Sequence, residues 1–358
     1  MANKTTHLPM ITQIVPTADT IPVNWWWFQI LLIVTFLLHI ILMNFILGGS
    51  LLSLWDSFRK KPAIEGKSIP TLIALTINLG VPPLLFVQVI FGNFFYTSSV
   101  LMAGPWILLI PILIIAYYGA YIYVFKKTSS PLFSKISLLI SSIFLLFIGF
   151  MLVNNNTLML TPERWSAYVD NKSGWMLNLG EPTLWPRYLH FIIGAIAIAG
   201  LGKTLFYHFK KDIDTETKQH EKSRGMKIFA FATMIQVVVG IWFWLSLPEP
   251  IWKFFMGGNI VATIWLMLGI LLALVLIFTA SRKLMTLTVS LAAFLLLNMI
   301  ITREIVRHQY LKGIGEPSNL TTTGEIGSLI LFLFTFLIGI ALIYYMIKLI
   351  FKPKNTVI

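Results

Sequence analysis

The sequence predicts an all-α integral membrane protein: a bundle of nine membrane-spanning helices with the N-terminus outside and the C-terminus in the cytoplasm. Three observations predict this class. Of the 358 residues, 57% are hydrophobic and 11% are charged, and the mean hydropathy is +0.82. Apolar runs long enough to cross a bilayer recur from end to end, and in lipid such runs must be helices because nothing there can hydrogen-bond an open backbone. Basic residues, finally, gather in alternate connections.

The apolar runs place the nine spans in order along the chain. They are expected at residues 26–55, 69–92, 104–125, 132–153, 184–209, 226–247, 255–281, 284–302 and 326–351. Residues 1–25 then form an outer tail, 26–351 a single membrane domain, and 352–358 a cytoplasmic tail. The first 24 residues are polar and hold no apolar stretch of signal-peptide type, so we expect no cleaved targeting segment.

Lysine and arginine predict the orientation. The first, third, fifth and seventh connections and the C-terminal end carry most of them: Arg59, Lys60, Lys61, Lys67, Lys126, Lys127, Lys135, Lys210, Lys211, Lys218, Lys222, Arg224, Lys227, Arg282, Lys283, Lys348, Lys352 and Lys354. Cytoplasmic loops are enriched in these residues, so we expect a bacterial inner membrane protein with these connections inside. The net charge of +13 has the same origin and does not indicate nucleic-acid binding.

The chain contains no cysteine. This excludes disulfides, zinc–thiolate sites, iron–sulfur clusters and covalent attachment of a c-type haem. A redox cofactor would therefore be held without covalent bonds.

Polar residues within the spans are few, and intramembrane ionisable residues tend to mark function. They are His39 in the first span, Gln88 and Asn93 at the end of the second, Arg187 and His190 at the start of the fifth, and Arg303, Glu304, Arg307 and His308 at the end of the eighth. With the predicted orientation, all of them lie in the outer half of the membrane. This convergence predicts a functional site at that level.

The fifth span opens with WPRYLHFIIGAIAIAG, in which Arg187, His190 and Gly194 share one helical face. Imidazole is a common axial ligand of haem iron, the small residues beside it would leave a flat groove for a porphyrin, and the arginine could pair with haem propionates. The alternative is a histidine that hydrogen-bonds a neighbouring helix, with glycine used for close packing.

Two further positions have ordinary alternatives. His39 stands alone on an apolar face, without a polar neighbour, and by itself is more typical of a packing residue. Glu304 is costly to bury, and Arg303, Arg307 and His308 lie within about one turn of it. The alternative for this group is a solvated helix end whose charges pair with one another.

Five segments resemble, in chain order, subunit I of the cytochrome bd-type quinol oxidases. They are FLLHIILMNFILGGSLL, VQVIFGNFFYTSS, NNNTLMLTPERW, RYLHFIIGA and REIVRHQYL. The resemblance implies the family's nine-span fold, two or three haem b groups and quinol as substrate. It implies His39, His190 and Glu304 as metal ligands and Glu304 with Arg307 as the catalytic pair. The wider cofactor-binding set is Arg187, Gly194, Gln88, Asn93, Arg303, His308 and Met267.

Departures from the family alter the expected chemistry. Gln88 and Ile110 replace two glutamates of the family's proton route, and neither can exchange protons. The segment LPEPIWKFFMGGN crosses directly where the family has a large quinol-binding loop. Trp265 stands near the methionine that completes the low-spin haem site, with Met267 as a substitute at an unmatched position. Val306 and HQYL replace the glycine and the Gln-Pro-Trp that follow the glutamate of the eighth span.

The leading hypothesis is a haem b membrane subunit of a bd-like respiratory complex. It would transfer electrons between the quinone pool and an outer-face partner, a c-type cytochrome, beside a second membrane subunit. A divergent terminal quinol oxidase is the alternative enzyme, although we expect its activity to be weak or absent. A haem-free proton-coupled transporter and a haem-free scaffolding subunit are the alternatives from other classes.

Overall fold

The computed structural model of the chain describes residues 14–59, 69–170, 172–211 and 213–351. Over these residues it is all-helical, and its one isolated bridge joins Ile21 to Thr322. The tail 352–358 and the first part of the tail 1–25 lie outside the described residues.

Nine helices of the described chain are long and apolar enough to cross a membrane, which confirms the predicted class. They are α2 (Trp25–Phe58), α3 (Ile69–Leu101), α4 (Ala103–Lys126), α5 (Pro131–Leu160), α6 (Leu184–Phe209), α7 (Thr215–Leu245), α9 (Ile260–Ser281), α10 (Met285–Tyr310) and α11 (Ile326–Phe351). Short helical turns lie in the connections: η2 (Pro162–Tyr168), α8 (Glu249–Lys253), η3 (Phe254–Gly258) and η4 (Pro317–Asn319).

Two helix starts differ from the predicted ones for local reasons. Helix α7 begins at Thr215 instead of 226, because the side chain of Asp214 caps it by accepting a hydrogen bond of 2.7 Å from the Thr217 N–H. Helix α9 begins at Ile260 instead of 255. Gly257, at φ +99°, breaks the preceding π-helical turn, and Asn259 then caps the new helix.

Three helices continue past the end of the predicted apolar run: α3 to Leu101, α5 to Leu160 and α10 to Tyr310. These extensions carry polar residues, but α3 and α5 pack on each other and on η2 there. Helix α10 contacts α3 through the rings of His308 and Phe91, and α5 through the hydrogen bond from Arg303 to Asn156. The group Arg303–His308 therefore lies inside a helix, and not in a loop beyond it.

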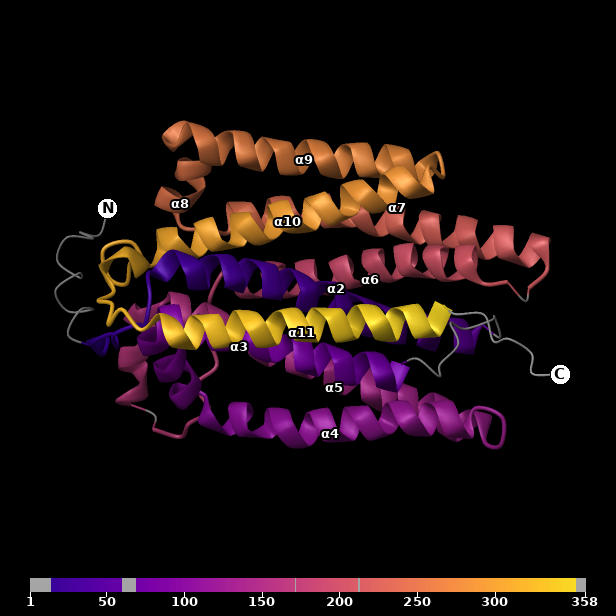
Figure 1. Cartoon of the computed structure of the whole chain (residues 1–358), viewed down its shortest axis with the longest axis horizontal. Helices are drawn as coiled ribbons and strands as arrows, with labels where there is room; N and C mark the ends of the chain where they lie inside the picture. The colour runs from indigo at the N-terminus through magenta and orange to yellow at the C-terminus, as the bar shows by residue number, and fades with distance from the viewer. Residues whose placement is uncertain (1–13, 60–68, 171, 212, 352–358) are drawn as a thin grey trace.

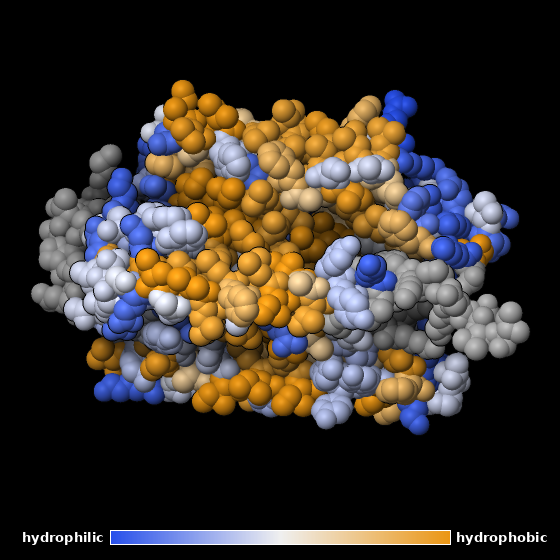
Figure 2. Space-filling model, viewed as in Figure 1, coloured by the Kyte–Doolittle hydropathy of each residue, from blue (hydrophilic) through white to orange (hydrophobic). Residues whose placement is uncertain are grey.

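The helices form two groups that lie side by side (Figure 1). Helices α2 to α5 pack together, α6, α7, α9 and α10 pack together, and close packing of α2 on α6 joins the groups. Helix α11 lies at the periphery, where Leu329 and Phe332 contact the cluster around Phe86 of α3. Figure 2 shows a broad apolar band across one face with hydrophilic residues at both ends, as expected of a membrane protein.

The two ends of the bundle differ in composition and are named here for it. The aromatic end is where α2, α4, α6, α9 and α11 begin and α3, α5, α7 and α10 end. The basic end holds the opposite termini, with the connections that are rich in lysine and arginine.

Helix packing is tighter toward the basic end. A Cβ built on Gly48 of α2 would lie 2.0 Å from the carbonyl oxygen of Ala195, and one on Gly200 of α6 would lie 2.9 Å from the carbonyl oxygen of Gly225. Residues 188–194 of α6, by contrast, are all half-buried. Seven residues cover every side of a helix with 3.6 residues per turn, so α6 is incompletely covered on all sides at that level.

Candidate functional site

His190 and Arg187 lie on the first turns of α6, where it packs on α7. The Nδ1 atom of the half-buried His190 ring is itself buried and has no hydrogen-bond partner. Gly240 makes room for the ring, since a Cβ there would lie 3.3 Å from His190 Cε1. Arg187 is 7% exposed, and its Cζ lies 4.8 Å from the centre of the Phe243 ring. Its Nε and Nη2 atoms have no hydrogen-bond partner, so this guanidinium can bind an anion.

The small residue beside His190 does not leave the open groove that the sequence predicts. Gln236 of α7 lies over Gly194, with its Nε2 atom 3.3 Å from the position of a Cβ. The same Nε2 donates a hydrogen bond of 2.9 Å to the carbonyl of His190. The amide therefore takes part of the space that the small residues were expected to offer, and its buried Oε1 atom has no hydrogen-bond partner.

His39 lies midway along α2 and faces α3. Its Nδ1 atom is 3.1 Å from the carbonyl oxygen of Thr76, so the ring has a polar partner that the sequence did not reveal. Gly80 makes room for this ring as well: a Cβ there would lie 2.8 Å from His39 Cε1. A histidine that donates from Nδ1 to a carbonyl presents Nε2 as the ligating atom, which is the usual arrangement at metal sites.

Glu304 is the centre of a buried cluster at the aromatic end. Arg303 Nη1 donates to one carboxylate oxygen at 2.7 Å, and Arg307 Nη1 donates to the other at 2.6 Å. Gln29 Nε2 of α2 donates to the second oxygen at 3.2 Å. Glu304 and Arg307 are buried, so the alternative of a solvated helix end does not hold here.

Gln29 is a residue that sequence reasoning misses. Because its Nε2 atom donates to Glu304, its Oε1 atom accepts from His308 Nε2, 3.1 Å away. Its one signal in the sequence is that it is an amide inside an apolar span. Asn156 of α5 belongs to the same cluster, since its Oδ1 atom accepts a hydrogen bond of 3.3 Å from Arg303 Nη2.

Positive charge exceeds negative charge in this region. Arg187, Arg303 and Arg307 lie within electrostatic range of one another. Glu304 pairs with the last two, and the Nε atom of Arg307 is buried without a partner. Glu181 lies within electrostatic range of Arg187 but forms its ion pair with Arg164. An anionic group between α6 and α10 would relieve this imbalance.

Gln88, Asn93 and Met267 have other surroundings. Gln88 Oε1 accepts a hydrogen bond of 3.4 Å from the Tyr96 hydroxyl, and Asn93 Nδ2 donates one of 3.1 Å to the carbonyl of Pro16. Met267 is 45% exposed on α9, a helix that packs on α7 and α10. In the part of the chain that the structure describes, none of the three hydrogen-bonds to His39, His190 or Glu304.

A second buried charge cluster, at the basic end, is also missed by sequence reasoning. Lys203 of α6 is 0% exposed, and its Nζ atom lies 2.9 Å from Asp56 Oδ2 of α2 and 2.7 Å from Glu221 Oε2 of α7. Arg224 pairs with both carboxylates. Its residues look like loop charges in the sequence, except Lys203, which lies well inside the predicted fifth span.

The donor set fits haem better than a metal ion held by several side chains. In the described ranges, no three or more His, Asp or Glu side chains gather as a metal site, so His39, His190 and Glu304 do not form one centre. A haem needs one or two axial ligands, which single imidazoles supply. The unpaired N–H groups of Arg187 and Arg307 suit its two propionates.

Comparison with known proteins assigns no family: no protein-family model, curated protein or solved structure matches this chain.

Proposed function

We propose that the chain is a haem b-binding membrane subunit of a bd-like respiratory complex, which transfers electrons between the quinone pool and an outer-face c-type cytochrome. One observation carries the proposal. Arg187, a buried guanidinium with two unpaired nitrogen atoms, lies one helical turn from His190, whose Nδ1 atom is also unpaired. The resemblance to subunit I of the bd-type oxidases supports the same assignment.

The side chains divide the work of holding the cofactor. His190 and His39 would each ligate a haem, and Arg187 and Arg307 would bind propionates. Haem supplies one-electron redox chemistry. The apolar helices around these residues exclude water and so strengthen each charge interaction at the site.

The positive-inside rule supports the orientation. The basic end faces the cytoplasm of a bacterial inner membrane, and the aromatic end, with Arg187, Glu304 and the start of α2, faces outward. Electrons would therefore leave toward an outer partner across a short distance.

Glu304 and Arg307 have a role in tuning rather than in oxygen chemistry under this proposal. Three donors already bind the carboxylate of Glu304. Gln88 cannot exchange protons, and Ile110 is 69% exposed on the outside of α4. A proton relay needs titrating groups, and neither position supplies one.

An optical spectrum of the purified protein tests the proposal. We expect a reduced haem b spectrum and a loss of haem in His190→Ala. His220→Ala is the matched control, because His220 lies exposed at the basic end. Protein that lacks haem after purification and after reconstitution with hemin would refute the proposal and restore the transporter and scaffold alternatives.

Oxygen uptake with a reduced quinol separates this function from the terminal oxidase, which Glu304 keeps as the second candidate. We expect little or no uptake by the purified protein or its native complex. Turnover above roughly 1–10 per second, typical of enzymes, would establish the oxidase instead.

A further inference from the structure

A buried carboxylate lies next to the unpaired guanidinium of Arg187. Glu181, just before the start of α6, is 6% exposed. Thr183 contacts both residues: its Oγ1 atom donates a hydrogen bond of 3.0 Å to Glu181 Oε1, and its carbonyl accepts one of 3.1 Å from the Arg187 N–H. Glu181 also lies within electrostatic range of Arg187. Two buried side chains of opposite charge at this separation are natural partners for an ion pair.

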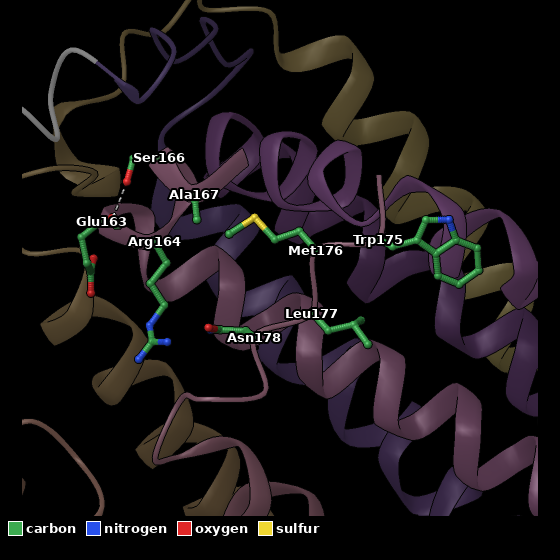
Figure 3. Close-up of a pocket in the computed structure, with 8 residues that line it drawn as sticks. All are labelled: Glu163, Arg164, Ser166, Ala167, Trp175, Met176, Leu177 and Asn178. Carbon is green, nitrogen blue, oxygen red and sulfur yellow. Dashed lines mark hydrogen bonds between the residues drawn. The ribbon is translucent and has the colours of Figure 1, made fainter. Parts of the chain in front are cut away.

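Glu181 pairs instead with Arg164 of η2. The Arg164 Nη2 atom lies 3.4 Å from Glu181 Oε2 and donates a hydrogen bond of 3.3 Å to the carbonyl of the adjacent Gly180. The Arg164 side chain is 39% exposed. With Asn178 it lines a cavity of about 570 Å³ at the aromatic end (Figure 3). The cation that holds Glu181 is therefore partly hydrated, and its attraction to the carboxylate is screened.

The two arginines near Glu181 thus differ in burial and in pairing. Arg187 is buried, lies over the Phe243 ring of α7, and has two nitrogen atoms without a hydrogen-bond partner. Loss of Arg164 would leave the Glu181 carboxylate buried without its cation, which is costly. Arg187 is a cation within range that has donors to offer. The contact with Arg164 therefore decides whether Glu181 stays away from Arg187.

We propose that Glu181 is an internal counter-anion that competes with the carboxylate of a ligand for Arg187, and that Arg164 holds Glu181 away and so keeps Arg187 open. The inference rests on the proposed function for the ligand, whose carboxylate is then a haem propionate. Arg164 is a positioning residue, because it acts on the site through Glu181 and does not contact the ligand. Loading of the site thereby depends on η2, in the segment that joins α5 to α6.

Thermal unfolding of the haem-free protein tests the change of partner without haem. We expect Arg164→Gln to lower the melting temperature at least about twice as far in an Arg187→Met background as in the parent, because Glu181 then has no second cation to pair with. Equal losses in the two backgrounds would overturn the proposal.

Lys253→Gln is the matched control for this comparison. It breaks an ion pair with Glu249 at the same end of the bundle, but both of these side chains are exposed. Its effect should be small and the same in the two backgrounds.

Titration with two porphyrin probes tests the competition for Arg187. The probes are hemin and hemin dimethyl ester, in which methyl groups mask both propionates. We expect Arg164→Gln to weaken hemin binding about tenfold, because Glu181 then occupies Arg187. The double variant with Glu181→Gln should recover the parental affinity, and the ester should bind to the parent and to Arg164→Gln equally.

Each outcome bears on one of the two proposals. Parental hemin affinity in Arg164→Gln, a loss that Glu181→Gln does not rescue, or an equal loss for the ester would overturn the role of Arg164 and leave the haem assignment intact. A protein that binds neither probe would refute the proposed function. The unfolding comparison would then still decide whether Glu181 turns to Arg187.

Discussion

The two buried charge clusters of this protein differ in their balance of positive and negative charge. At the basic end, Lys203 and Arg224 face Asp56 and Glu221, two cations with two carboxylates, and each charge has an opposite partner. At the aromatic end, Glu304 pairs with Arg303 and Arg307, and two nitrogen atoms of the nearby Arg187 have no partner. The first cluster is balanced in charge, whereas in the second the arginines outnumber the carboxylate that pairs with them.

Helix packing follows the same division. The helices close tightly around the basic-end cluster, with glycines at the contacts, whereas α6 is half-buried all round beside Arg187 and His190. At the basic end, where every charge is paired and the helices pack closely, the cluster holds the two helix groups together. Incomplete pairing with loose packing is what the proposed binding site would require. Opposite responses to loss of a cation are therefore expected at the two ends.

Loss of the Lys203 ammonium group should have the largest effect on the free energy of unfolding. Lys203→Met leaves Asp56 and Glu221 buried with a single cation, which costs about 3–5 kcal/mol of the free energy of unfolding. Thermal unfolding in detergent measures the change, with exposed Lys227→Met as control. Asp56→Asn combined with Lys203→Met restores charge balance and should recover part of the loss, so a double variant less stable than the single one would contradict a paired cluster.

Adding a methyl group at the close contact between α2 and α6 should have the next largest effect on the free energy of unfolding. Gly48→Ala places a Cβ 2.0 Å from the carbonyl oxygen of Ala195, whereas a Cβ at the adjacent Gly49 meets nothing within 4 Å. We expect Gly48→Ala to lose about 1–3 kcal/mol and Gly49→Ala to unfold with the parent. Equal melting temperatures for the two variants would show that the close approach does not hold the helix groups together.

Removal of Arg187 should have the opposite sign to removal of Lys203. Replacing a buried unpaired cation by an apolar side chain relieves its desolvation, so Arg187→Met should stabilise the haem-free protein by about 1–3 kcal/mol. The same variant should retain less haem. Exposed Arg282→Met at the basic end is the control, and a destabilised haem-free Arg187→Met would mean that the arginine is already satisfied.

The smallest expected effect is at His39. A Cβ at Gly80 would lie 2.8 Å from its ring, so Gly80→Ala should displace the imidazole from the carbonyl of Thr76 at a cost of about 1 kcal/mol. If His39 binds a second haem, the ratio of haem to protein should fall. Gly92→Ala, whose Cβ would be 3.4 Å from Tyr96, controls for the substitution, and an unchanged haem ratio in Gly80→Ala would argue against the second haem.

Much of the fold could be predicted because its cause is local. Nine apolar runs correspond to the nine long apolar helices of the described chain. The predicted boundaries were wrong at the starts of α7 and α9, where capping by Asp214 and a break at Gly257 intervene, and at the ends of α3, α5 and α10, which continue past the apolar run. The site was less predictable. Arg187 and His190 were found from their position in a span, but the contacts of Gln29 and Gln236 come from other helices and leave no periodic signal.

The sequence by itself determined the class, the spans and the alternation of basic connections. They follow from the local composition of each segment and from the need of every backbone N–H and C=O group in lipid for a hydrogen bond within the protein. Tertiary structure alone decided which charges are balanced. Lys203 pairs with two carboxylates, whereas Arg187 forms no ion pair within the described residues. Pairing depends on which helices lie side by side and how closely they approach, and the close approach at Gly48 is a property of two helices together.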